Sequence, residues 1–119
     1  MFNTVKIGDK DVPMLAMASV DVYYRNIFHS DPIAIQMKET DEASAIVFFE
    51  QMGFVMAKFA ELKKSSEMRK LNEDLYIDWL GQFKRGDYIA ALPDVMAVYN
   101  GQQVTNSDPK KKDEEPSAE

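Results

Sequence analysis

The carboxylates are the side chains in this sequence whose spacing could support chemistry. They occur in short groups, namely Asp9 with Asp11, Glu39 with Asp41 and Glu42, and Glu73 with Asp74. Paired carboxylates can act as general acid and general base. These groups, however, coincide with a predicted turn and with predicted helix starts, where acidic residues stabilise local structure without any catalytic role. The pair at the turn also lacks the glycine and the distal glutamate of a calcium-binding loop.

The remaining reactive residues do not assemble into a recognisable site. His29 is the only histidine and there is no cysteine, so a metal site is not indicated. Glu50 lies in the most apolar predicted helix, where an unpaired buried charge is costly, and we expect it at a solvated edge. The sequence contains no GxSxG, no Walker-type glycine-rich loop and no HExxH motif. We therefore expect no enzyme, no catalytic residue, no cofactor and no metal.

The composition is that of a small acidic protein. A chain of 119 residues is long enough for one domain with a core that needs no disulfides. A net charge of −6 argues against binding to a nucleic-acid backbone. Asp9 and Asp11 interrupt any signal-peptide h-region, so no secretory signal is expected. Residues 43–60 approach membrane-spanning length, but Glu50 and Gln51 at their centre favour a buried helix over a membrane span.

The N-terminal third predicts a hairpin followed by a helix. Apolar and polar residues alternate on either side of the polar run 8–11, with apolar positions at Val5, Ile7, Val12 and Met14. Pro13 restricts the second strand to a sheet edge. Ser19 is expected to cap a helix whose apolar residues follow helical spacing, at Val20, Tyr23, Tyr24, Ile27 and Phe28. Asp31 and Pro32 end this helix and open a short segment over residues 32–37.

A long central helix is predicted over residues 41–64, capped by Thr40 or Asp41. It is apolar over most of its circumference, with a narrow polar stripe at Ser44, Gln51 and Lys58. Such a helix is covered on several sides. The sequence leaves open whether its surface is fully buried or partly exposed as an interface.

Residues 71–99 carry the most distinctive pattern. Apolar residues recur every four positions at Leu71, Leu75, Trp79 and Phe83, which predicts one helical stripe. Lys84 and Arg85 would form the last turn, Gly86 the left-handed residue after it, and Asp87 the next cap. Pro93 would then break that helix or start a third one. Asn72 either caps the first of these helices or lies inside a helix that starts near Ser66.

We expect these elements to form a mainly α-helical domain with a short N-terminal β-hairpin over residues 1–103. Residues 104–119 contain too little apolar surface to offset the entropy of ordering, so a disordered charged tail is predicted there.

The candidate partner-binding residues are methionines and aromatic or apolar side chains. Eight methionines is a high count, and flexible thioethers suit either adaptable binding surfaces or irregular cores. Aromatic anchors dominate binding energies, although a lone tryptophan suits a core equally well. The candidates are Met52, Met56, Phe59, Trp79, Phe83, Tyr88, Leu92 and Met96.

The pattern Trp79-Leu80-x-x-Phe83, a polar break, an aromatic–apolar pair and Ala91-Leu92-Pro93-x-x-Met96 resembles the small tail assembly chaperones of long-tailed, siphovirus-type bacteriophages, especially those of Gram-positive hosts. The order of elements over residues 3–100 is also similar. Lys84 and Arg85 depart from the pattern, since such chaperones often carry another acidic residue after the phenylalanine.

This resemblance implies a protein that binds the phage tape measure protein, keeps it soluble and helps to recruit tail tube subunits during tail morphogenesis. It implies action in the host cytoplasm during assembly, absence from the mature virion, possible self-association, and no role for nucleic acid or membrane. Members of the family often yield a longer product by translational frameshift, for which the lysine codons of residues 110–112 are a candidate site. The alternatives are a structural tail subunit, of completion or connector type, that forms a stable ring, and a small-ligand or regulatory domain.

Overall fold

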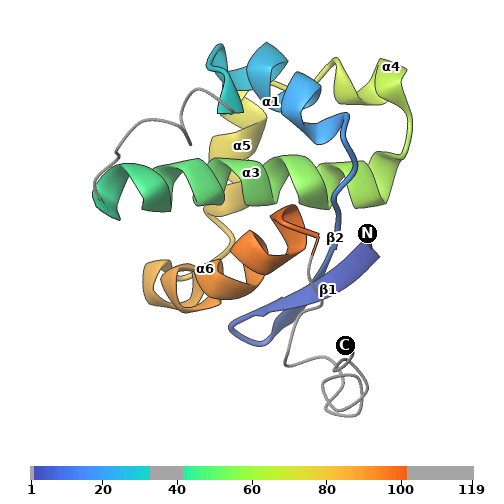
Figure 1. Ribbon diagram of the computed structural model, residues 1–119. Coiled ribbons are helices and arrows are strands. Elements are labelled where there is room, and N and C mark those ends of the chain that lie inside the picture. Colours follow the sequence, from blue (N-terminus) through green and yellow to red (C-terminus); the bar gives the residue numbers. More distant parts are fainter. Residues whose placement is uncertain (1, 33–41, 102–119) are drawn as a thin grey trace, which may run out of the picture.

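The computed structural model describes residues 2–32 and 42–101. The elements follow the order β1 (Phe2–Ile7), β2 (Lys10–Leu15), α1 (Val20–Phe28), α3 (Glu42–Leu62), α4 (Ser65–Met68), α5 (Glu73–Leu80) and α6 (Arg85–Tyr99). This is the predicted mainly helical domain with an N-terminal hairpin (Figure 1). The predicted caps at Thr40 and Asp41, most of the segment 32–37, the boundary at residue 103 and the tail 104–119 lie outside the described residues.

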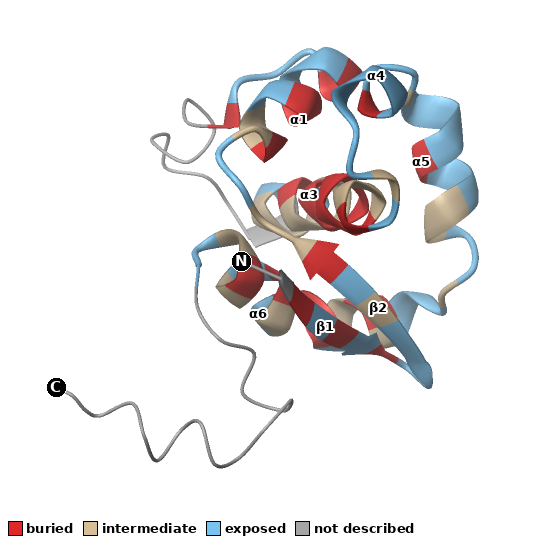
Figure 2. Ribbon diagram, turned by 90° about the vertical axis from the view of Figure 1, so that its right-hand side faces the viewer, coloured by how far each residue is buried: buried red, intermediate tan, exposed pale blue. Residues whose placement is uncertain are grey.

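Helix α3 is the centre of the domain, and it contacts β2, α1, α5 and α6. In Figure 2 it is seen end-on, with the hairpin and α6 below it, α1 and α4 above it and α5 to its right. Its middle is enclosed, since Met52, Phe54, Val55 and Met56 have no exposed surface. Ser44 and Val47 near its start are exposed, and Gln51 and Lys58 are half-buried. The helix is therefore covered on several sides, as predicted, and is open to solvent only along a part of its surface.

The hairpin closes one side of this core. Ile7 pairs with Lys10, so Gly8 and Asp9 alone form the turn, which is shorter than the predicted polar run. Gly8 has a φ of +64°, and a Cβ there would lie 2.6 Å from the Asp87 carboxylate in the first turn of α6. A side chain at this position would therefore strain the backbone and press against α6. Pro13 is exposed on β2, whose only pairing in the described chain is with β1.

Helix α1 confirms the predicted apolar pattern, because its buried residues are Val20, Tyr23, Tyr24, Ile27 and Phe28. Ser19 occupies the predicted N-cap position, but its side chain makes no capping hydrogen bond. His29 ends the helix in a left-handed conformation with φ +59°, and its N–H donates to the carbonyl of Arg25. His29 thus ends α1 through its backbone.

The boundaries of α5 differ from those predicted. The Asn72 side chain accepts a 2.9 Å hydrogen bond from the N–H of Leu75, so Asn72 is the N-cap. The helix ends at Leu80 with Gly81 as its C-cap, and the predicted end at Gly86 is wrong. The predicted four-residue stripe is wrong as well, because Leu71 and Phe83 lie outside α5 and Leu75 is exposed. Residues four positions apart are rotated by about 40° around the helix axis. Over the three steps from Leu71 to Phe83 this rotation reaches about 120°, so the four residues cannot all face the core.

Helix α6 begins at Arg85 and continues through Pro93, so the predicted break at this proline is wrong. Gly86 and Asp87 lie in its first turn, not before it. Pro93 lacks the N–H that would bond to the carbonyl of Ile89, yet buried residues on both sides of it hold the helix against α3 and β1, namely Tyr88, Ala91, Leu92, Val95 and Val98. Tertiary packing outweighs the local signal here.

Candidate functional site

Three of the predicted partner-binding residues meet in one aromatic cluster. The ring of Trp79 in α5 lies 5.0 Å from that of Phe83 and 5.8 Å from that of Tyr88, measured between centroids. Phe83 and Tyr88 are 5.7 Å apart. Trp79 also packs at 5.6 Å on Phe54, which joins the cluster to α3. The three rings therefore support the turn between α5 and α6.

The other predicted residues are dispersed. Met52, Met56 and Leu92 are buried, so a partner of the folded domain does not reach them. Phe59 is half-buried and packs edge-on against Tyr23 at 5.6 Å. Met96 lies on α6 with 40% of its surface exposed. Of the eight candidates, Phe59, Trp79, Phe83 and Met96 are the ones with accessible surface.

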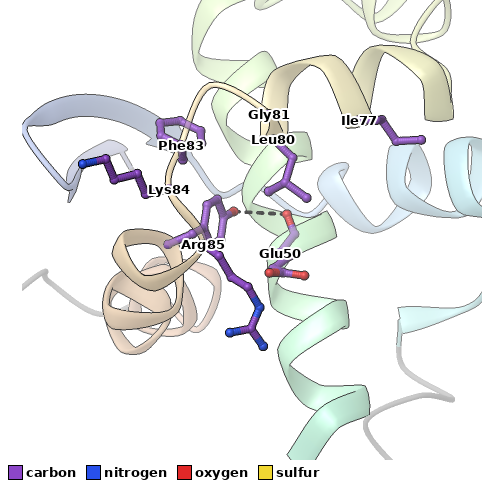
Figure 3. A pocket seen from close by; sticks show the side chains of 8 residues that line it. Glu50, Ile77, Leu80, Gly81, Phe83, Lys84 and Arg85 are labelled. Carbon is purple, nitrogen blue, oxygen red and sulfur yellow. Dashed lines mark hydrogen bonds between the residues drawn. The ribbon is translucent and has the colours of Figure 1, made fainter.

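An open hollow of about 390 Å³ lies beside the aromatic cluster, between α5, α6 and the middle of α3. We call it the α5–α6 groove, and its lining residues are Glu50, Ile77, Leu80, Gly81, Phe83, Lys84, Arg85 and Tyr88. Figure 3 shows Leu80 and Arg85 approaching Glu50, whereas Lys84 extends away and Ile77 lies at the outer edge. The walls are mostly apolar and the charged groups lie at the rim and floor.

Ile77 is the feature that sequence reasoning missed. It is 61% exposed, the most exposed large apolar side chain in the described part of the protein. It belongs to no predicted stripe, and its neighbours in sequence on α5 are acidic or aromatic. Single exposed apolar residues are common on protein surfaces, so the sequence alone offered no signal that distinguishes Ile77.

The back wall of the groove is closely packed, because the Tyr88 hydroxyl lies against Gly53. The Tyr88 hydroxyl donates a 3.1 Å hydrogen bond to the carbonyl of Glu50, drawn as a dashed line in Figure 3. Gly53 follows one turn later on α3, and a Cβ there would collide with the same hydroxyl. Burial is the largest cause that raises the pKa of Tyr88, so this phenol stays neutral at physiological pH.

Glu50 is the ionisable group on the groove floor. It is half-buried, and desolvation raises the pKa of its carboxyl, while the positive charge of Arg85 partly offsets this effect. The two side chains do not form a direct ion pair in the described structure. A carboxylate at this position can accept a hydrogen bond or pair with a cation that enters the groove.

The predicted acidic groups occupy structural positions where the structure describes them. Asp9 lies in the hairpin turn, and Asp11 forms an exposed 3.5 Å ion pair with Lys6. Glu73 and Asp74 lie in the first turn of α5. Within residues 2–32 and 42–101, no group of three or more metal-ligating side chains is close enough to hold an ion.

A membrane span is likewise not found, since no helix in the described residues is both long and apolar enough to cross a bilayer. The arrangement that the structure does provide is an open, mostly apolar groove with charges at its edge. Such a surface suits binding of an apolar segment through side-chain packing.

Comparisons with protein-family models, with curated proteins and with solved structures find no match for this chain.

Proposed function

We propose that this protein is a tail assembly chaperone of a long-tailed bacteriophage, and that it binds helical segments of the tape measure protein in the α5–α6 groove. The observation that carries the proposal is this open apolar groove, because Leu80 and Phe83 of the motif on which the resemblance rests line it, and Trp79 packs against Phe83. In this role the protein keeps the tape measure soluble in the host cytoplasm, helps to recruit tail tube subunits, and is absent from the finished virion.

The size of the groove suits such a partner. Helix α5 has eight residues and is therefore about 12 Å long, so one copy covers roughly two turns of a partner helix. Anchoring side chains at i and i+3 or i+4 of the partner would enter between Ile77 and Phe83. A long apolar helix would need many copies along its length, each bound weakly.

The proposal is tested by co-expression of the chain with the tape measure protein encoded beside it. Soluble yield of the tape measure and its co-purification with the chain are measured. Rescue into solution with binding supports the proposal. A tape measure that stays insoluble and unbound beside a folded chain contradicts it, and a stable ring formed without the tape measure favours the structural tail subunit.

Two matched variants test the groove. Ile77→Glu places a charge at the apolar edge, and we expect binding to weaken by about tenfold or more, because an exposed contact of this size contributes about 1.5–3 kcal/mol. Leu75→Glu is the control, since Leu75 is 42% exposed on the same short helix but does not line the groove. Equal loss in both variants would place the binding surface elsewhere.

A further inference from the structure

We infer that the free chain forms a two-fold symmetric dimer through α5, in which Ile77 of each copy enters the α5–α6 groove of the other. The occupant of the groove in the free protein is thus a second copy of this chain. The inference does not rest on the proposed function, because it concerns the chain alone.

The first argument is shape. Ile77 projects from the edge of a hollow that it does not fill, with 61% of its surface exposed. Under two-fold symmetry, Ile77 of the first copy lies in the groove of the second, and Ile77 of the second lies in the groove of the first. Each copy then covers the exposed isoleucine of the other. Gly81 lies between Ile77 and Lys84 without a side chain, which allows a second helix to approach closely.

The second argument is charge. The start of α5 presents the exposed acids Glu73 and Asp74, whereas the exposed bases Lys84 and Arg85 lie beyond its C-terminus, where the chain enters α6. None of these residues takes part in a direct ion pair within the described chain. The surface of α5 therefore runs from negative to positive along its axis.

In a two-fold dimer, the acidic end of α5 in one copy faces the basic end in the other. In an antiparallel pair, each step toward the N-terminus of one α5 is a step toward the C-terminus of the other. Glu73 lies four residues before Ile77, on the same flank of the helix. If Ile77 contacts Leu80 of the second copy, the end of α5 that carries Glu73 faces the turn after α5 of that copy, which leads to Lys84, and the same arrangement forms again on the other side. A parallel arrangement would instead bring like charges together.

The contact is small, because it consists of one eight-residue helix and the turn after it. Small interfaces give weak, reversible association, so we expect dimerisation only at high protein concentration. In an isologous contact both copies use the same surface, so the assembly stops at a dimer. If the proposed function is correct, tape measure segments compete with the second copy for the same groove.

The test is sedimentation equilibrium of the full chain at concentrations up to about 1 mM, which would detect a dissociation constant in the range of weak complexes. We expect a reversible monomer–dimer equilibrium. Ile77→Glu should weaken it about tenfold or more, whereas Leu75→Glu, outside the groove, should leave it unchanged. Circular dichroism of each variant confirms that α5 and the rest of the domain are folded.

A charge exchange identifies the antiparallel pairing. Glu73→Lys and Lys84→Glu should each weaken the dimer, and the double variant should restore it. A chain that is monomeric up to the highest concentration, assemblies larger than a dimer, or a double variant no stronger than the single ones would each overturn the inference. A monomeric chain or an unrestored double variant would not affect co-purification with the tape measure, so failure of the dimer and failure of the proposed function are distinguishable.

Discussion

At the scale of single residues, the contact between Gly53 and Tyr88 is the tightest constraint on the groove. Alanine is a better helix former than glycine by about 0.5–1 kcal/mol, so Gly53→Ala in an open helix would stabilise the protein. Here the added methyl group collides with the buried hydroxyl of Tyr88. We expect Gly53→Ala to destabilise the domain by about 1–3 kcal/mol, measured by urea unfolding.

Two further variants separate the collision from helix propensity. Gly86 lies in the first turn of α6 with no atom within 4 Å of an added Cβ, so Gly86→Ala should be neutral or stabilising. Tyr88→Phe removes the colliding oxygen, and in that background Gly53→Ala should cost less. If Gly53→Ala and Gly86→Ala change the free energy of unfolding equally, the contact between Gly53 and Tyr88 does not contribute to stability.

Glu50 and Arg85 provide a second prediction at this scale. Burial raises the pKa of Glu50 above its ordinary value of 4.5 and Arg85 lowers it, so Arg85→Gln should raise it further. The folded state then binds more protons than the unfolded state just above pH 4.5, and stability falls as the pH rises through this window. A ¹³C NMR titration of the Glu50 carboxyl measures the shift. An unchanged or lower pKa would mean that Arg85 does not act on this carboxylate.

At the scale of elements, Pro93 tests how far packing overrides local preference. It is exposed in the middle of α6 and makes no bond to the preceding turn. Pro93→Ala restores the missing N–H and should stabilise the domain by about 1–3 kcal/mol, reduced by the greater freedom of the unfolded chain. Thermal unfolding measures the gain. Pro13→Ala, exposed on the edge strand β2, is the control and should change stability little.

The balance between local sequence pattern and tertiary packing explains which elements were predictable from sequence. The hairpin, α1 and α3 have local patterns that agree with their packing, and all three were predicted. Gly81 and Gly86 both offer a local stop signal, and the choice between them depends on Phe83 folding back onto Trp79, a contact between two elements. Pro93 failed as a boundary for the same reason, since the buried residues around it decide the outcome.

The candidate site was predictable only in part. Trp79, Phe83 and Tyr88 follow from the aromatic pattern, and the structure brings them together. The exposure of Ile77 depends on which face of α5 packs toward α3: the predicted stripe placed Trp79 correctly but put Leu75, and not Tyr76, on the buried face. The burial of Met52 and Met56 depends in turn on how many elements surround α3. Both are tertiary properties that periodicity alone does not determine.

At the scale of the whole molecule, the central position of α3 predicts a single cooperative unit. The hairpin, α1, α5 and α6 each contact this helix, so none of them keeps its buried face if α3 is lost. Phe54 in α3 is fully buried and packs at 5.6 Å on both Tyr76 and Trp79. We expect Phe54→Ala to cost about 3–5 kcal/mol, a large part of the stability of a small domain.

Two spectroscopic probes show whether the groove unfolds together with the rest of the domain. Trp79 is the only tryptophan, so its fluorescence reports α5 and the groove wall, while far-UV circular dichroism reports all helices. In a cooperative domain both signals change at the same urea concentration, and Phe54→Ala shifts them together. If fluorescence changes first, α5 leaves the core before the rest unfolds. The groove would then be a separately opening element, and a partner or a second copy that binds there would stabilise α5 more than the remainder of the domain.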